Sequence, residues 1–206
     1  MSRGWTRHEG LAVALPIDGI DTDQLIPARF LSRSRSEGYG DFLLHDLRFD
    51  TQRNEKACFP LNDPAASGAS LLVAGRNFGG GSSREAAVYA LVDFGIRVVV
   101  APSFGDIFAA NAVNNGLLPA LVSPKDAEAL LEALAGGPAR MSADLESGTL
   151  HLGQRTIPFT LDPVWREKLL RGWDDIDLTA SHAEAIAAFR AHDAEARPWA
   201  RPGAET

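Results

Sequence analysis

The chain has 206 residues, 45% hydrophobic and 23% charged, so it is long enough to bury a core and is neither disordered nor fibrous. Its formal net charge of −7 disfavours binding to nucleic acids and to anionic membranes, because both require a basic surface. The one cysteine, Cys58, excludes an intrachain disulfide and any metal site built from this chain's thiolates alone.

Targeting signals are not expected in this sequence. The first apolar stretch, residues 11–15, is short and ends at Pro16 without a small-residue cleavage pattern. No later apolar run approaches the length of a membrane span. These features predict a cytoplasmic protein, in which Cys58 is expected to be buried or partly buried.

The first half of the chain predicts a βαβ unit. Residues 11–15 indicate a buried strand, and the Pro-, Gly- and Asp-rich stretch 16–27 indicates a loop. The stretch 30–63 shows no sustained period, which predicts a long loop. After it come a second buried strand (70–75), a glycine-rich loop, an amphipathic helix stopped by Gly95, and a central strand (96–101).

The second half continues the alternation and then changes character. It predicts a helix over 103–116, a strand over 117–122, a helix over 124–137, a β-meander over 140–161, and helices over 162–172 and 181–196. We therefore expect one domain over residues 1–196 and a flexible tail over 197–206.

The stretch 77–85 reads NFGGGSSRE and allows three interpretations. It is not a nucleotide loop, because no Lys follows the last glycine and the sixth position of a G-x-G-x-x-G pattern is Arg84. It could be a capping box, in which Ser82 and Glu85 satisfy the free amides of a helix start. A capping box explains neither the three glycines nor Ser83 and Arg84.

The third interpretation is a carboxylate site. Glycines let backbone amides approach a ligand, a helix N-terminus attracts an anion, and Arg84 offers two parallel hydrogen bonds. A serine held there could abstract a proton from carbon if the amides and the cation stabilise its alkoxide. This pattern points to an acid–base enzyme acting on a carboxylic acid.

Several longer stretches resemble a known family. DTDQLIPARFL (21–31), NFGGGSSRE (77–85) and APSFGDIFAANAVNNGLLP (101–119) are similar to the small subunits of 3-isopropylmalate dehydratase, an aconitase-superfamily isomerase of leucine biosynthesis. GYGDFLLHDLRF and DDIDLTASHAEAIAAF look similar too, so the resemblance covers most of the chain.

The resemblance implies an α/β fold, the swivelling β/β/α three-layer domain that corresponds to the mobile domain of aconitase. It implies a separate large subunit that carries a [4Fe–4S] cluster, while this chain binds no metal. The implied reaction moves a hydroxyl from C2 to C3 of isopropylmalate through an unsaturated diacid. Neither nucleic acid nor a membrane is an implied partner.

The resemblance also assigns site residues. Ser82 matches the family's alkoxide base. The residues implied to bind or select the substrate are Thr22, Asp23, Gly81, Ser83, Arg84, Arg33 and Arg35. From the residues alone, Asp21 and Asp23 could equally make local Asx turns, and Arg33 and Arg35 could be solvated surface charges.

Two positions depart from the family's usual GCGSSREHA motif. This chain has Gly80 where the family usually has Cys, and Ala86 where it usually has His. The departures leave open a related hydro-lyase acting on citramalate or a dimethylmalate. The sequence is also compatible with a non-catalytic carboxylate-binding module and with a scaffold whose helix is merely capped.

Overall fold

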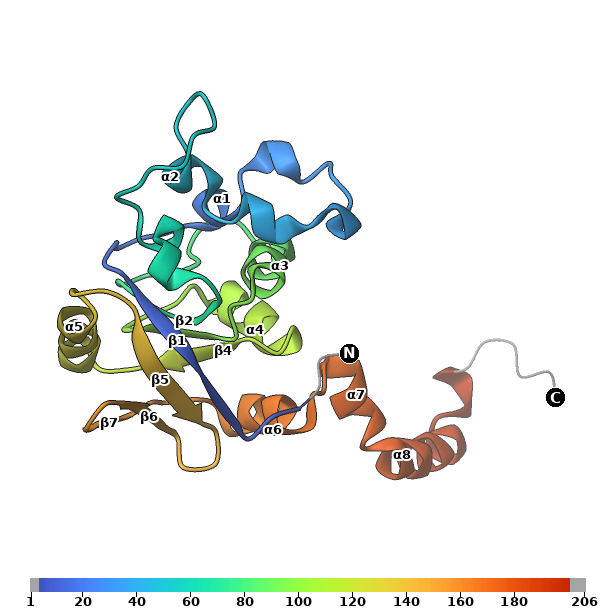
Figure 1. Ribbon diagram of the computed structural model, residues 1–206. Helices are drawn as coiled ribbons and strands as arrows, with labels where there is room; N and C mark the ends of the chain where they lie inside the picture. The colour runs from blue at the N-terminus through green and yellow to red at the C-terminus, as the bar shows by residue number, and fades with distance from the viewer. Residues whose placement is uncertain (1–3, 201–206) are drawn as a thin grey trace.

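In the computed structural model, which describes residues 4–200, one curled sheet runs through the body of the protein (Figure 1). The strand order is β4-β3-β2-β1-β5-β6-β7. Strands β1 to β4 are parallel, whereas β5 pairs with β1 in the antiparallel direction and begins the meander β5-β6-β7. The strands are β1 Arg7–Leu15, β2 Ala69–Ala74, β3 Val98–Ala101, β4 Leu118–Leu121, β5 Ala139–Asp144, β6 Thr149–Leu152 and β7 Arg155–Pro158.

The helices between the parallel strands confirm the predicted βαβ pattern. Helix α3 connects β2 to β3, and α4 connects β3 to β4. Gly95 ends α3 with a φ of 114°, a conformation that favours glycine. The helices are α1 Thr22–Leu25, α2 His45–Arg48, α3 Glu85–Phe94, α4 Asp106–Asn114, α5 Pro124–Ala133, α6 Pro163–Arg171, α7 Asp175–Ala180 and α8 Ala183–Ala196.

Both faces of the parallel strands are buried, which gives the domain three layers. On β2, Leu72 and Ala74 join a first core cluster with residues of α1, α3 and the segment between β1 and β2. Leu71 and Val73 point to the opposite face and join a second cluster with residues of α5, α6 and the meander. Each fully buried Leu or Val stabilises the fold by about 1.5–3 kcal/mol.

The segment 30–63 folds into short helical turns that cover α3 (Figure 1). Four-residue helix α2 lies within it, and the other turns are of the 3₁₀ type. Tyr39 and Leu43 are buried in the first core cluster, and a Cβ added to Gly40 would lie 2.6 Å from the backbone nitrogen of Phe94. Turns this short are too brief to show a hydrophobic period in the sequence.

The two ends of the chain are described in part. Pro198–Ala200 form a 3₁₀ turn after α8, and the remainder of the expected tail, 201–206, lies outside the described residues, as do residues 1–3. No helix within residues 4–200 has the length and apolar character needed to cross a membrane.

Candidate functional site

Three loops meet where parallel strands β1, β2 and β3 end. The Gly79 amide donates to the carbonyl of Ile20 (2.7 Å), which joins the loop after β2 to the loop after β1. The Phe78 amide donates to the carbonyl of Ser103 (3.1 Å), in the loop after β3. In open α/β sheets, ligands bind at this carboxyl edge. The glycine-rich stretch therefore lies where the topology places a ligand site.

The first glycine of the run is required by packing. Gly79 has a φ of +72°, and a Cβ added there would lie 2.2 Å from Cγ of Phe108 on α4. Gly105 faces it, because a Cβ on Gly105 would lie 2.6 Å from the Gly79 carbonyl oxygen. The loop after β2 and the loop after β3 are therefore too close at Gly79 and Gly105 to accommodate a side chain at either position.

We predict that Gly79→Ala lowers the free energy of unfolding by at least about 2 kcal/mol, because it adds a steric overlap to a left-handed backbone. Gly19→Ala is the matched control, since Gly19 has a φ of +68° and nothing within 4 Å of the added Cβ. Urea denaturation of both variants separates the two contributions. Equal losses in both variants would show that the contact with Phe108 is unimportant.

The side chain of Ser82 is exposed on this loop, and its backbone carbonyl is fixed by a hydrogen bond from α1. The hydroxyl of Thr22, which is 1% exposed, donates to the Ser82 carbonyl oxygen at 2.9 Å. The Thr22 amide donates to the carbonyl of Gly80 at 2.9 Å. Among residues 4–200, none hydrogen-bonds the Ser82 hydroxyl. The loop is thus fixed while the Ser82 oxygen stays available to a ligand.

Arg84 links the end of the glycine-rich loop to α1. Its guanidinium is 21% exposed and forms an ion pair with Asp23, which lies in the first turn of α1 and is 53% exposed. The two residues are 61 positions apart in the chain. Thr22, Asp23, Gly81, Ser82 and Arg84, all expected site residues, therefore come from two neighbouring segments. Ser83 is exposed on the same loop.

The capping-box interpretation of Ser82 and Glu85 is wrong. Helix α3 begins at Glu85, its N-cap is Arg84, and no side chain caps it. The Glu85 carboxylate instead accepts from the side-chain amide of Asn115, the C-cap residue of α4, at 3.0 Å. The three-residue spacing places Ser82 too far ahead of the helix to act as its cap.

The two aspartates of the Asp-Thr-Asp turn have different roles. Asp21 caps α1: its carboxylate accepts from the Gln24 amide at 2.7 Å, and the Gln24 side chain accepts from the Asp21 amide at 3.0 Å. The local hydrogen bonding that the sequence allowed for both aspartates is therefore found for Asp21. Asp23 reaches across to Arg84 instead.

Arg33 and Arg35 are both paired with carboxylates. Arg33 contacts Glu37 at 3.1 Å within its own segment. Arg35 contacts Asp93 on α3 at 2.7 Å and lies over the Tyr89 ring, 3.9 Å from its centroid. The Asp93 hydrogen bonds raise the pKa of Arg35. Arg35 also lines a cavity of about 580 Å³ with Glu85, so it lies on the same side of the molecule as the start of α3.

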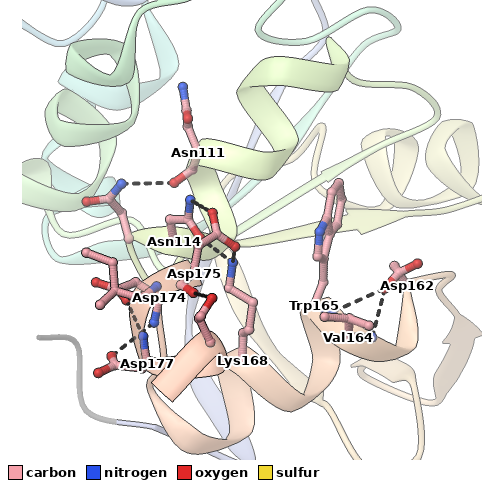
Figure 2. A network of polar contacts seen from close by, with 12 residues as sticks. Asn111, Asn114, Asp162, Val164, Trp165, Lys168, Asp174, Asp175 and Asp177 are labelled. Carbon is pink, nitrogen blue, oxygen red and sulfur yellow. Dashed lines mark hydrogen bonds and ion pairs between the residues drawn. The ribbon is translucent and has the colours of Figure 1, made fainter. Parts of the chain in front are cut away.

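A polar network not predicted from the sequence connects α4 to the last helices (Figure 2), and Asn115 extends it to Glu85 on α3. Lys168 on α6 has a side chain only 3% exposed and donates to Asp175 at 2.6 Å and to the side-chain oxygen of Asn114. Asn114 donates in turn to Asp175 at 2.9 Å, and the next residue, Asn115, holds Glu85. The hydrogen bond from Lys168 lowers the pKa of Asp175. A lysine on an amphipathic helix carries no sequence signal of burial.

We predict that Lys168→Met lowers the free energy of unfolding by about 1–2 kcal/mol, because it leaves the Asn114 side-chain oxygen unpaired. The ion pair itself adds little, since Asp175 is 72% exposed. Chemical denaturation measures the loss, with Lys125→Met, at an exposed position of α5, as the control. An unchanged unfolding free energy would contradict a structural role for the network.

The described residues do not fit a metal or an iron–sulfur cluster. Within residues 4–200, no three side chains of His, Cys, Asp or Glu gather in a way that could hold a metal ion. Cys58 is exposed, which corrects the expectation that it is buried or partly buried. Cys58 lies between short surface turns and packs against neither core cluster.

Comparisons with known proteins identify the family of this chain. Residues 2–125 match the Aconitase C-terminal domain family. The 3-isopropylmalate dehydratase small subunit of Caulobacter vibrioides is 46% identical over 198 residues, which cover 96% of this chain and 98% of that protein. The small subunit of Shouchella clausii is 44% identical over 182 residues, 88% of this chain and 92% of that protein.

A solved structure confirms the predicted fold class. 3-Isopropylmalate dehydratase from Methanocaldococcus jannaschii superposes with a TM-score of 0.64 at 24% identity, covering 88% of this chain and 98% of that one. The swivelling β/β/α fold of the aconitase C-terminal domain is therefore the fold of this protein. By sequence and by fold, the chain belongs to the family of 3-isopropylmalate dehydratase small subunits.

Proposed function

We propose that this chain is the small subunit of a cytoplasmic hydro-lyase that converts 2-isopropylmalate into 3-isopropylmalate in leucine biosynthesis. The observation that carries the proposal is the exposed Ser82 hydroxyl, held on a fixed loop beside Arg84. Identity of 46% with a curated small subunit over 96% of the chain supports the same conclusion.

Ser82 is the proposed base. As an alkoxide it takes the proton from C3 while the hydroxyl leaves C2 as hydroxide, so a carbon–carbon double bond forms. The hydroxide and the proton now held by Ser82 together make up the water that is removed. Re-addition places the hydroxyl on C3 and returns a proton to C2. The free amides at the start of α3 and the nearby Arg84 charge favour the negative oxygen that this step requires.

Arg84 is the proposed carboxylate ligand. In the free chain it is paired with Asp23, so a substrate carboxylate takes the position that the Asp23 carboxylate holds. Gly81 and Ser83 complete the binding loop. Thr22 acts by fixing the Ser82 backbone, because its hydroxyl is already donated to that carbonyl. Arg33 and Arg35 are proposed to select the substituent of the diacid.

The [4Fe–4S] cluster belongs to the large subunit in this proposal. The argument is the chain's single cysteine and the lack, among the described residues, of any cluster of metal-binding side chains. This chain contributes the base and the carboxylate ligand, so neither subunit is active alone.

A related hydro-lyase for citramalate or a dimethylmalate is the second candidate. Gly80 and Ala86 favour it, since both are smaller than the family's usual Cys and His. A Cβ on Gly80 would lie 3.0 Å from the Asn77 side-chain nitrogen, and Ala86 packs at the edge of the first core cluster. The missing side chains change the immediate surroundings of the loop without removing Ser82 or Arg84.

An anaerobic assay tests the proposal. The chain is mixed with its cluster-bearing large subunit, and formation of the unsaturated intermediate is followed by absorbance with 2-isopropylmalate, citramalate and dimethylmalate in parallel. We expect turnover of 2-isopropylmalate only when both subunits are present. Turnover of another diacid alone would replace the substrate assignment. Binding of diacids without turnover, with the cluster intact, would favour the non-catalytic module.

A further inference from the structure

The last helices form an arm that extends from the body of the protein (Figure 1). We define the C-terminal arm as residues 174–200, which include α7, α8 and the turn Pro198–Ala200. None of the 14 residues of α8 is buried. The arm nevertheless carries large apolar side chains: Ile176 is 77% exposed, Phe189 is 62% exposed and Trp199 is 77% exposed.

Ile176 lies along a groove of the arm, whereas Phe189 and Trp199 are exposed outside that groove. Helices α7 and α8 line a hollow of about 820 Å³, to which Ile176, Ala183 and Ile186 contribute. A 14-residue helix is only marginally stable in water without packing. Clustered exposed apolar residues mark interaction surfaces more often than chance exposure does. The arm therefore has the properties of a docking element.

The base of the arm is fixed to the body by polar contacts. Asp175 is held by the buried Lys168 and by Asn114, and Asp174 caps α7 through the amides of Ile176 and Asp177 (Figure 2). This base shares the cavity of about 580 Å³ with Glu85, the residue that follows Arg84. The base of the arm therefore lies beside the start of α3, the helix that follows the Ser82 loop.

The charge of the arm disfavours pairing with a second copy of this chain. Residues 174–200 contain six acidic and two basic residues, a net charge of −4 with His neutral. Pairing two copies through this arm would bring together like charges in chains that each carry −7. A different protein, with an apolar surface rimmed by Lys and Arg, meets no such repulsion.

We propose that the C-terminal arm is a docking surface for the large subunit, bound through Ile176, Ile186 and Phe189 and steered by its acidic charge. The inference rests on the proposed assembly of the two subunits. It goes beyond the chemistry of the Ser82 loop, because it places part of the binding energy on helices that never touch the substrate.

The test measures affinity of the full chain for the large subunit by isothermal titration calorimetry. We expect the double variant Ile176→Ser/Phe189→Ser to bind at least about 10-fold more weakly than the unchanged chain, since both side chains would be central contacts. Val164→Ser is the matched control, because Val164 is 48% exposed on α6 and outside the arm. Far-UV circular dichroism and thermal unfolding of each free chain establish that the variants fold.

Hydrogen exchange gives an independent measurement on the unchanged chain. Amides of α8 should exchange more slowly once the large subunit is added. Unchanged affinity of the double variant together with unchanged exchange in α8 would overturn the arm proposal while the assembly stands. If the unchanged chain does not bind the large subunit, the assembly itself fails. Self-association lost in the double variant, with affinity for the large subunit retained, would assign the arm to a second copy and overturn the proposal.

Discussion

Replacing Ser82 by alanine should lower turnover of the two-subunit enzyme by about 100- to 10,000-fold, the range expected for loss of a general base. KM should change little, because Arg84 is the proposed ligand of the substrate carboxylate and the loop is fixed through the backbone carbonyl of Ser82. Steady-state kinetics on the 2-isopropylmalate reaction separates kcat from KM.

Ser67→Ala is the control for this substitution. Ser67 is an exposed turn serine that precedes β2, whereas the Ser82 loop follows β2, so the two lie at opposite ends of the strand. Ser67→Ala should keep full kcat. A Ser82→Ala enzyme with normal kcat and raised KM would show that Ser82 binds substrate and that another group removes the proton.

Replacing Arg84 by glutamine should raise KM by about 100-fold, because two charge-assisted hydrogen bonds to a substrate carboxylate are lost. Arg84→Lys should recover only part of the loss, since an ammonium cannot make the two parallel bonds of a guanidinium. Calorimetric titration with the substrate diacid measures the same change as a dissociation constant.

Asp23→Asn tests the other side of this ion pair. Asp23 holds Arg84 in the free chain, so its neutral variant should lower KM severalfold by freeing the guanidinium. Its effect on stability should be small, because Asp23 is 53% exposed. A KM that rises in Asp23→Asn would instead make Asp23 a substrate ligand in its own right.

The spacing of apolar residues in the sequence predicted the regular helices and the buried strands of the sheet. The spacing of Ala87, Ala90, Leu91 and Phe94 gives α3, and the valine run at 98–100 gives β3. Strand β1 begins at Arg7, four residues before the apolar stretch at 11–15, because residues 7–10 pair with β5. Residues 7–10 are partly exposed and contain no continuous apolar run, so the sequence alone does not identify them as part of a strand. Their pairing with β5 does.

Contacts between distant residues could not be predicted. The sequence places Arg84 beside Ser82, and nothing in it shows that Asp23, 61 positions away, holds the guanidinium. The capping box failed for a related reason: its pattern requires only a three-residue spacing, while the helix starts where packing of the loop allows. The buried Lys168 likewise depends on α4 and α7, which meet it only in the folded chain.

Strand β1 has a further consequence, for how the chain is made. It pairs with β2 on one edge and with β5 on the other, and Arg7 lies opposite Asp144. During synthesis, one edge of β1 therefore stays open until residue 144 has emerged from the ribosome. A fragment ending at residue 125, where the family match ends, would keep that edge open permanently and lose the meander from the second core cluster. Such a fragment is expected to aggregate through edge pairing, so the meander is indispensable to a domain whose candidate site it does not help to form.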